Sequence, residues 1–246
     1  MSFRQGARQF FERRGAPAWT NPYVTDGLVA MWDGEWNAGG GVHDANATTW
    51  VDLSNNGHNL TIPSTIAFGD DYGMASDKGG AVIIRPSSVY DAIVSAGGYT
   101  IEAVFESSGV NGAIATIGNE DTIYSFSTSR ASFRASDKYN GSGTNLTLQY
   151  SIATTSVAKK SWAMTVELGE ETLLYENATI NRILSSGGIA GMQYPQFVGI
   201  GLNSSYPDSN DGAAGKYYSV RLYSRALTAA EIAANYAIDK ARFNLP

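Results

Sequence analysis

Residues 99–106 read Tyr-Thr-Ile-Glu-Ala-Val-Phe-Glu, so that one set of alternate positions is entirely apolar and the other is largely polar. Residues 162–167, Trp-Ala-Met-Thr-Val-Glu, follow the same rhythm. Side chains alternate between the two faces of a strand, and a period of two with one apolar face is typical of half-buried antiparallel strands. Residues 28–32, Leu-Val-Ala-Met-Trp, form a third, wholly apolar run. These stretches predict an antiparallel sheet protein.

Turn signals between the apolar runs support the same fold class. The pairs Asn56-Gly57, Asn111-Gly112 and Asn140-Gly141 supply residues that accept positive φ, as tight hairpins require. Apolar residues make up 43% and charged residues 16%, with 27 glycines and 14 tyrosines, which is typical of many short strands. We predict an all-β fold, an antiparallel two-sheet jelly-roll sandwich, forming one domain over residues 23–246. Its core should contain Trp32, Trp50 and Trp162.

The C-terminal part of this domain carries the clearest helix signal. Thr228 can cap a helix, Glu231 can complete a capping box, and Leu227 can pack on Ile232. We predict a helix over residues 229–242 that lies against the sandwich and covers a sheet edge.

Residues 1–22 are expected to form an N-terminal arm, made of a short amphipathic helix and a linker. The arm is predicted to dock on a protein partner or a larger assembly, as a homo-oligomer or on a virion. A frayed terminus and docking on the sandwich itself are the alternatives. The expected docking residues are Phe3, Arg4, Arg8, Phe10, Phe11 and Arg14.

Longer motifs resemble one known superfamily. Residues 215–228, Gly-Lys-Tyr-Tyr-Ser-Val-Arg-Leu-Tyr-Ser-Arg-Ala-Leu-Thr, resemble the closing strand and helix start of laminin-G-like domains in the concanavalin-A-like lectin and glucanase superfamily. Residues 27–34 and 50–57 look like its first strand and its W-x-D-L-S-G-N-G turn, with Asn55 where glycine is usual. Residues 162–178 resemble a hairpin that often ends in Y-x-N-G, here Tyr-Glu-Asn-Ala. The resemblance implies a jelly roll. It leaves the function open, because the superfamily includes lectins, adhesion modules, glycosidases and virion proteins.

Catalysis has little support in the sequence. A retaining glucanase of this type needs paired carboxylates, commonly in an E-x-D-x-E strand. Glu102 and Glu106 have that spacing, but Val104 replaces the aspartate, so a solvated strand face is the favoured interpretation. His43 and His58 are the only histidines and no nucleophile motif or cysteine accompanies them. We therefore predict that the protein is not an enzyme.

Sugar binding would require aromatic rings for stacking, with amides and carboxylates beside them for hydroxyl groups. Packing at the rim of the sandwich is the alternative role for each such residue. The Asp208–Gly212 turn also concentrates oxygen ligands that suit calcium, although a plain polar turn explains it equally. The candidate carbohydrate-binding residues are Trp36, Asn37, Tyr72, Tyr139, Tyr206, Asp208 and Asn210, and the candidate calcium ligands are Asp208, Asn210 and Asp211.

Charge narrows the range of partners. The net charge is −6, and beyond residue 15 there are 13 basic against 22 acidic residues, which disfavours binding to nucleic acid. No apolar stretch reaches 18 residues, so no membrane span is expected. We predict a non-catalytic recognition or structural module, namely a phage or prophage decoration or fibre protein that contacts surface glycans. The alternatives are a secreted or cell-surface bacterial adhesin or carbohydrate-binding module, and a glycoside hydrolase of the glucanase type.

Overall fold

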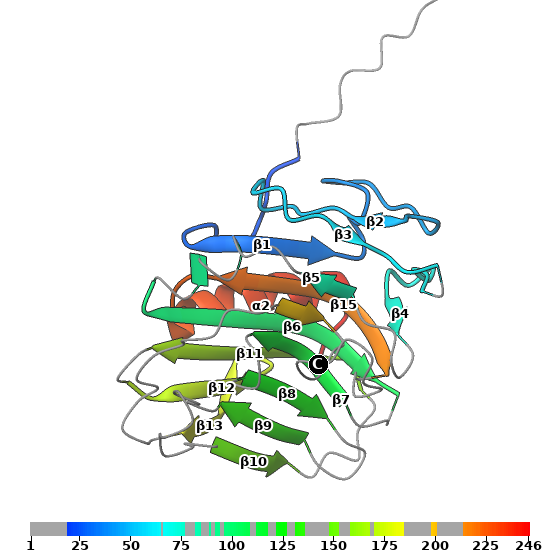
Figure 1. Cartoon of the computed structure of the whole chain (residues 1–246). Helices are drawn as coiled ribbons and strands as arrows, with labels where there is room; N and C mark the ends of the chain where they lie inside the picture. Colours follow the sequence, from blue (N-terminus) through cyan, green and yellow to red (C-terminus); the bar gives the residue numbers. More distant parts are fainter. Residues whose placement is uncertain are drawn as a thin grey trace, which may run out of the picture.

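The structure is a computed structural model of the 246-residue chain. It describes residues 19–64, 66–76, 82–84, 89, 92–93, 96–108, 112–117, 122–126, 131–135, 148–152, 158–167, 170–184, 198–200 and 214–246. Over these ranges the chain forms two antiparallel sheets, a small two-stranded ribbon and one C-terminal helix, α2 (Figure 1). The predicted all-β sandwich is therefore confirmed.

Seven of the described strands form the larger sheet, in the order β1-β15-β6-β11-β12-β13 with β4 added beside β15. These strands are β1 (Leu28–Asp33), β4 (Met74–Ser76), β6 (Gly98–Ser107), β11 (Lys160–Glu167), β12 (Thr172–Glu176), β13 (Thr179–Leu184) and β15 (Gly215–Tyr223). The second sheet has the order β10-β9-β8-β7-β14-β5 among the described residues, and β2 pairs with β3. These strands are β2 (Thr49–Trp50), β3 (Leu60–Thr61), β5 (Val82–Ile84), β7 (Gly112–Ile117), β8 (Thr122–Phe126), β9 (Ala131–Ala135), β10 (Leu148–Ile152) and β14 (Val198–Ile200).

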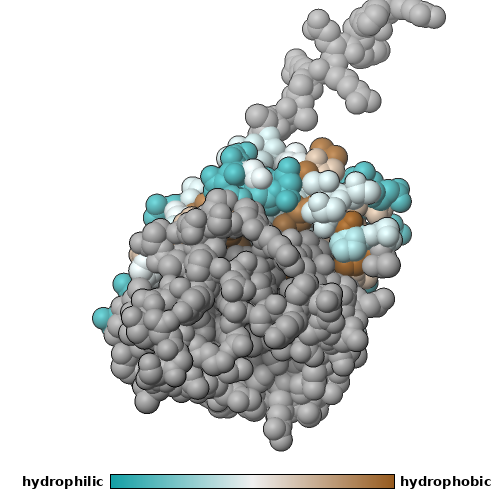
Figure 2. All heavy atoms as spheres, viewed as in Figure 1, coloured by the Kyte–Doolittle hydropathy of each residue, from teal (hydrophilic) through white to brown (hydrophobic). Residues whose placement is uncertain are grey.

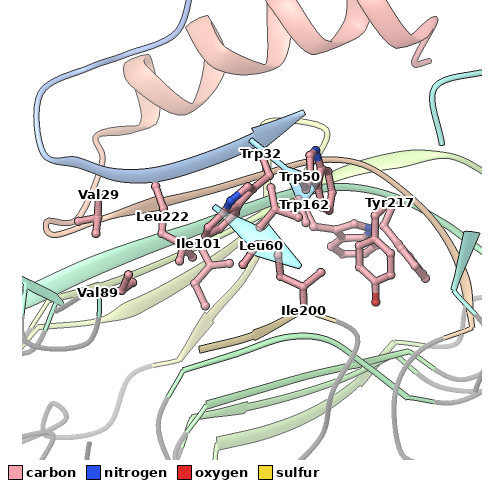
Figure 3. Close-up of a cluster of buried hydrophobic side chains, with 14 of the residues drawn as sticks. Val29, Trp32, Trp50, Leu60, Val89, Ile101, Trp162, Ile200, Tyr217 and Leu222 are labelled. Carbon is pink, nitrogen blue, oxygen red and sulfur yellow. The ribbon is translucent and has the colours of Figure 1, made fainter. Parts of the chain in front are cut away.

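The alternation seen in the sequence is also the burial pattern of the larger sheet. Ile101 on β6 pairs with Met164 on β11 and with Leu222 on β15, and all three side chains face the second sheet. Figure 3 shows this apolar cluster below the larger sheet, with the helix on the opposite side. Trp32, Trp50 and Trp162 are at most 3% exposed, so their predicted place in the core is confirmed.

The free edge of β1 is covered by the turn that resembles the superfamily motif. Asp52 is the centre of this turn: its carboxylate accepts hydrogen bonds from Met31 N on β1 (3.0 Å) and from His58 N (2.9 Å). The side chain of Asn56 donates to the carbonyl of Val29 at 2.9 Å. Asn55 has φ 69°, so asparagine takes the left-handed conformation where the superfamily usually has glycine. The motif thus satisfies backbone groups of an edge strand that would otherwise be open to pairing.

Helix α2 (Ala229–Phe243) begins as the sequence predicts. The Thr228 side chain accepts from Glu231 N, and the Glu231 side chain accepts from Thr228 N, which completes the capping box. The prediction that the helix covers a sheet edge is wrong. The buried Asn235 bonds to Glu102 on β6, and the buried Asp239 bonds to Arg221 on β15, so α2 lies on the outer face of the central strands. Two buried polar residues of the helix, Asn235 and Asp239, determine this position. A prediction based on the spacing of apolar residues does not detect them.

A bulge in β15 sets the orientation of Tyr218. The register between β15 and β6 shifts between Tyr217 and Ser219, which adds one residue to β15. Tyr217 faces the core, while Tyr218 packs on the outer face against Phe243 of α2. The bulge therefore places Tyr218 on the outer face, beside the loop of residues 69–73 that precedes β4.

Only the last four residues of the predicted arm, 19–22, are described by the structure. Residues 1–18, which contain all six expected docking residues, lie outside the described part. Residues 19–22 already contact the sandwich: the ring of Trp19 lies edge-on to Trp36 at 5.3 Å and against Gly40. Asn21 caps the backbone N–H of Tyr23 at 3.0 Å. These four residues of the predicted arm therefore pack on the sandwich.

Candidate functional site

The loop of residues 69–73, between the paired residues Phe68 and Met74, is a short and tightly closed surface turn. Gly69 N donates to Gly73 O, and Tyr72 N donates to Gly69 O, both at 2.9 Å. Tyr72 has φ 66° and its side chain is 37% exposed. A bulky residue seldom adopts this left-handed conformation, which costs of order 1 kcal/mol or more. The fold therefore holds an aromatic ring at the surface in a strained backbone conformation.

A first contact that holds this loop is a close approach to β1. The carbonyl oxygen of Tyr72 lies so near Gly34 that a Cβ atom added there would be 1.8 Å from it. Only glycine fits at position 34, because any other side chain would displace the loop. Gly34 itself donates its N–H to Tyr218 O at 2.8 Å.

A second contact is aromatic. The ring of His43 lies at 5.0 Å from the ring of Tyr72 and at 6.2 Å from that of Phe68, in both cases nearly perpendicular. Phe68 in turn packs edge-on to Trp50 at 5.5 Å. His43 Nδ1 lies 2.7 Å from Gly34 O, which fixes the plane of the imidazole. A continuous series of edge-to-face contacts therefore links the exposed Tyr72 to the core, an arrangement that aromatic quadrupoles favour.

A third contact is polar and involves Asp71. Its Oδ2 accepts hydrogen bonds from Lys216 Nζ at 2.6 Å and from Tyr218 OH at 3.1 Å. Although desolvation opposes it, the hydrogen bond from Lys216 lowers the pKa of Asp71, so the carboxylate stays ionised. Burial, followed by the neighbouring Glu106 carboxylate, raises the pKa of the Tyr218 phenol, which therefore remains a neutral donor rather than a nucleophile. Lys159 completes this group, with its ammonium 3.7 Å above the Tyr218 ring.

The surface that remains exposed around this loop is small and contains both polar and apolar side chains. Tyr72 and Asp70 are exposed on the loop, and Val42, next to His43, is 52% exposed. Asp70 makes no hydrogen bond or ion pair with another described residue. The coloured atoms along the upper part of the molecule in Figure 2 likewise show hydrophilic and hydrophobic residues interspersed. Such a surface suits a small amphipathic ligand better than a large apolar partner.

Two other predicted residues have internal partners. The ring of Trp36 lies 3.4 Å from the guanidinium carbon of Arg242 and also packs against Trp19. Asn37 is fully buried, and its amide bonds both the N–H and the carbonyl of Asp44, at 2.8 and 2.7 Å. Asn37 thus closes the base of the loop that presents His43 to Tyr72. Of the predicted binding residues in the described part, Tyr72 is the only one that is exposed.

The remaining candidates lie outside the described residues. They are Tyr139, Tyr206, Asp208, Asn210 and Asp211, which include all three predicted calcium ligands. Among the residues that are described, no group of three or more His, Asp or Glu side chains has a geometry that could hold a metal ion. No helix in the same ranges is long and apolar enough to cross a membrane.

The interpretation of Glu102 and Glu106 as a solvated strand face is wrong for Glu102, whereas Glu106 is half-buried. Glu102 is 2% exposed and lies under α2, where its Oε2 accepts from Arg221 Nε at 2.7 Å and from Asn235 Nδ2 at 2.8 Å. Glu106 lies further along the same face and accepts from Tyr218 OH at 2.7 Å. The two carboxylates therefore have different partners, Arg221 for one and a neutral phenol for the other.

Glu102 belongs to a buried network of charges between the sheet and α2. Arg221 is 1% exposed and forms two further hydrogen bonds to Asp239, at 3.0 and 2.5 Å. Tyr23 donates its hydroxyl to Asp239 at 2.7 Å and lies under the Arg221 guanidinium at 4.1 Å. Burial raises the pKa of Glu102, and the Arg221 charge opposes that shift. Glu102, Arg221 and Asp239 are at most 3% exposed and link the sheet to the helix, so we assign this network a structural role.

Comparisons with known proteins agree on the fold class. No protein-family model matches the chain, and no curated protein matches its sequence significantly. The fold is similar to the structure of Trypanosoma rangeli sialidase in complex with sialic acid, with a TM-score of 0.60 and 15% identity over 88% of this chain. It is also similar to the binding domain of botulinum neurotoxin DC in complex with rat synaptotagmin II, with a TM-score of 0.64 and 10% identity over 87% of this chain.

The similarity covers only part of these larger chains, 33% of the sialidase chain and 52% of the toxin binding domain. At this level of identity the similarity concerns the fold alone. The chain is thus an antiparallel β-sandwich of a kind that also occurs as one part of longer proteins.

Proposed function

We propose that this chain is a non-catalytic recognition module that binds surface glycans through the loop of residues 69–73. The observation that carries the proposal is Tyr72, an exposed aromatic residue in the left-handed region that contacts from β1, β15 and His43 hold in place. Strained residues that their surroundings lock in place are concentrated at ligand-binding sites. A fixed aromatic ring loses little entropy when it stacks on a pyranose ring, which favours binding.

Two further observations support recognition rather than catalysis. Glu102, the first of the two candidate catalytic carboxylates, is enclosed by Arg221 and α2, where a substrate has no access. The similar structures include a toxin binding domain in complex with synaptotagmin II and a sialidase in complex with sialic acid, so the same sandwich occurs in proteins that bind macromolecules and sugars.

The proposal that the protein is part of a larger particle rests on the sequence. The first fifteen residues carry four arginines and one glutamate, whereas the rest of the chain has a charge of −9. A basic arm on an acidic body suits assembly on a larger structure, and a phage or prophage virion is the setting that we propose. Deleting residues 1–18 should abolish particle association without lowering the melting temperature, because the sequence predicts that this segment is an arm separate from the core of the sandwich. Deleting residues 1–24 instead removes Tyr23 and should destabilise the body.

Glycan binding is tested with Tyr72→Gly on a glycan array. Glycine accepts φ 66° without strain, so the relief of about 1 kcal/mol offsets the lost contact with His43, and the melting temperature should not fall. Binding should nevertheless disappear. Ile180→Ala, at a residue 45% exposed on β13, is the matched control and should bind as the native protein does. Equal glycan binding by Tyr72→Gly and the native protein would reject this loop as the site.

A further inference from the structure

The charges around Tyr72 limit which sugars this loop can accept, and this inference rests on the proposed function. Asp70 and Asp71 precede Tyr72 directly, and both side chains are exposed. Asp71 is neutralised by Lys216 at 2.6 Å, whereas Asp70 has no hydrogen-bonding or ionic partner among the described residues. Within the described part of the chain, Asp70 is therefore an exposed carboxylate without a cationic partner, two positions before Tyr72.

The two described lysines near the loop, Lys159 and Lys216, do not offset this negative charge. Lys216 is bound to Asp71, and the hydrogen bond that it donates to that carboxylate raises the pKa of Lys216. Lys159 lies over the Tyr218 ring and within 3.4 Å of the Phe243 carbonyl, so its ammonium group already has partners. Neither lysine is thus available to bind the carboxylate of an acidic sugar.

A carboxylate can only accept hydrogen bonds, so Asp70 requires donors on the ligand. A pair of neighbouring sugar hydroxyls supplies two donors to one carboxylate, while the apolar face of the same ring covers Tyr72. A sialic or uronic acid would instead bring a second negative charge to a surface that already carries an excess of them.

We infer that the loop of residues 69–73 selects uncharged, hydroxyl-rich sugars and excludes anionic ones, with Asp70 as the residue that determines this specificity. The selection combines attraction and rejection: the same carboxylate binds hydroxyl donors and repels acidic groups. Electrostatic discrimination of this kind weakens when salt shortens the screening length, from about 30 Å at 0.01 M to about 4 Å at 0.5 M ionic strength.

The experiment measures the affinity of the full chain for matched probes, lactose against 3′-sialyllactose and galactan oligomers against oligogalacturonate. At low salt we expect a roughly tenfold higher affinity for the neutral member of whichever pair binds, and a smaller ratio of affinities at 0.5 M ionic strength. Asp70→Asn should lower the affinity for the neutral probe several-fold and reduce the preference for neutral over acidic probes. Asp26→Asn, which removes an 86% exposed carboxylate at the opposite end of β1, is the control and should change neither.

The outcomes separate the two proposals. If binding depends on Tyr72 but the acidic probe binds as tightly as the neutral one, the charge selectivity is wrong and the glycan site remains. If Asp26→Asn lowers the preference as much as Asp70→Asn does, the selectivity comes from net charge rather than from this loop, and the assignment to Asp70 is overturned. If no probe binds in a way that depends on Tyr72, both the selectivity and the proposed function are rejected.

Discussion

Replacing Arg221 with methionine tests whether the buried charges hold α2 on the sheet. Arg221 lies between Glu102 and Asp239, and none of the three side chains is more than 3% exposed. Methionine retains much of the volume but leaves two buried carboxylates without their cation. Removing one partner of a buried ion pair costs about 3–5 kcal/mol, so we expect a loss of about 4 kcal/mol in the free energy of unfolding. For a domain of this size that corresponds to a melting temperature lower by about 10 °C.

The pH dependence of the Arg221→Met variant gives a sharper test than the loss of stability at one pH. Burial already raises the pKa of Glu102 in the native protein, and removal of the arginine should raise it further. A carboxyl whose folded-state pKa lies above its unfolded value stabilises fully below the unfolded value, and this stabilisation is lost as the pH rises through the folded-state pKa. The variant should therefore lose less stability, relative to the native protein, near pH 4 than at pH 7.

The assay is urea unfolding followed by tryptophan fluorescence, with linear extrapolation at each pH. The companion variant combines Arg221→Met with Glu102→Gln and Asp239→Asn, which removes the stranded charges and should restore at least half of the lost stability. A cost below about 1 kcal/mol for Arg221→Met, or a triple variant as unstable as the single one, would refute the idea that the network is an ionic clamp.

Three further predictions concern the local motifs. Asp52→Ala should lower the free energy of unfolding by about 2–3 kcal/mol in urea titrations, because several backbone donors lose their acceptor, and unchanged stability would contradict its central role in the turn. Glu231 has a pKa lowered to about 2, chiefly by its hydrogen bond from Arg225, so its stabilising effect should be present above pH 4.3 and fade toward pH 2. Hydrogen exchange of the first turn of α2 should show this loss, and Glu231→Gln should remove the pH dependence. Gly34→Ala should displace the Tyr72 carbonyl and weaken glycan binding with the core intact, and a variant that binds normally would show that the close approach is not needed.

The strand pattern and the helix cap could be predicted from the sequence because both depend on neighbouring residues. The alternation over residues 99–106 lies within β6 (Gly98–Ser107), and the capping box at Thr228 starts α2 as expected. The turn at Asn177 and Ala178 is also local: both residues have positive φ, 49° and 60°, so alanine takes the place that glycine usually has there. Strands, caps and turns of this kind depend on residues close together in the sequence, so the pattern of neighbouring residues is enough to predict them.

The parts that the sequence could not predict depend on pairs far apart in the chain. Glu102 and Arg221 are separated by 119 positions, and nothing around Glu102 distinguishes a buried carboxylate from a solvated one. The bulge at Tyr218 depends on the register between β15 and β6, which a single strand does not encode. The two glycines around Tyr72 indicate a tight turn, but they do not indicate that tyrosine is the residue in the left-handed conformation. Trp36 is predicted to bind sugar, but its ring packs on Arg242, a partner at the far end of the chain that the sequence around Trp36 does not reveal.

The contact between Tyr23 and α2 bears on how this sandwich can be built into other proteins. The Tyr23 hydroxyl accepts from Arg242 at 2.6 Å, so side chains from the first and last described segments are joined to each other. A host protein that carried the sandwich as an insert in a surface loop would need tethers that leave this contact intact. For the same reason a circular permutant, joined by a flexible linker between residues 246 and 19 and reopened at the hairpin of Asn177, should still fold.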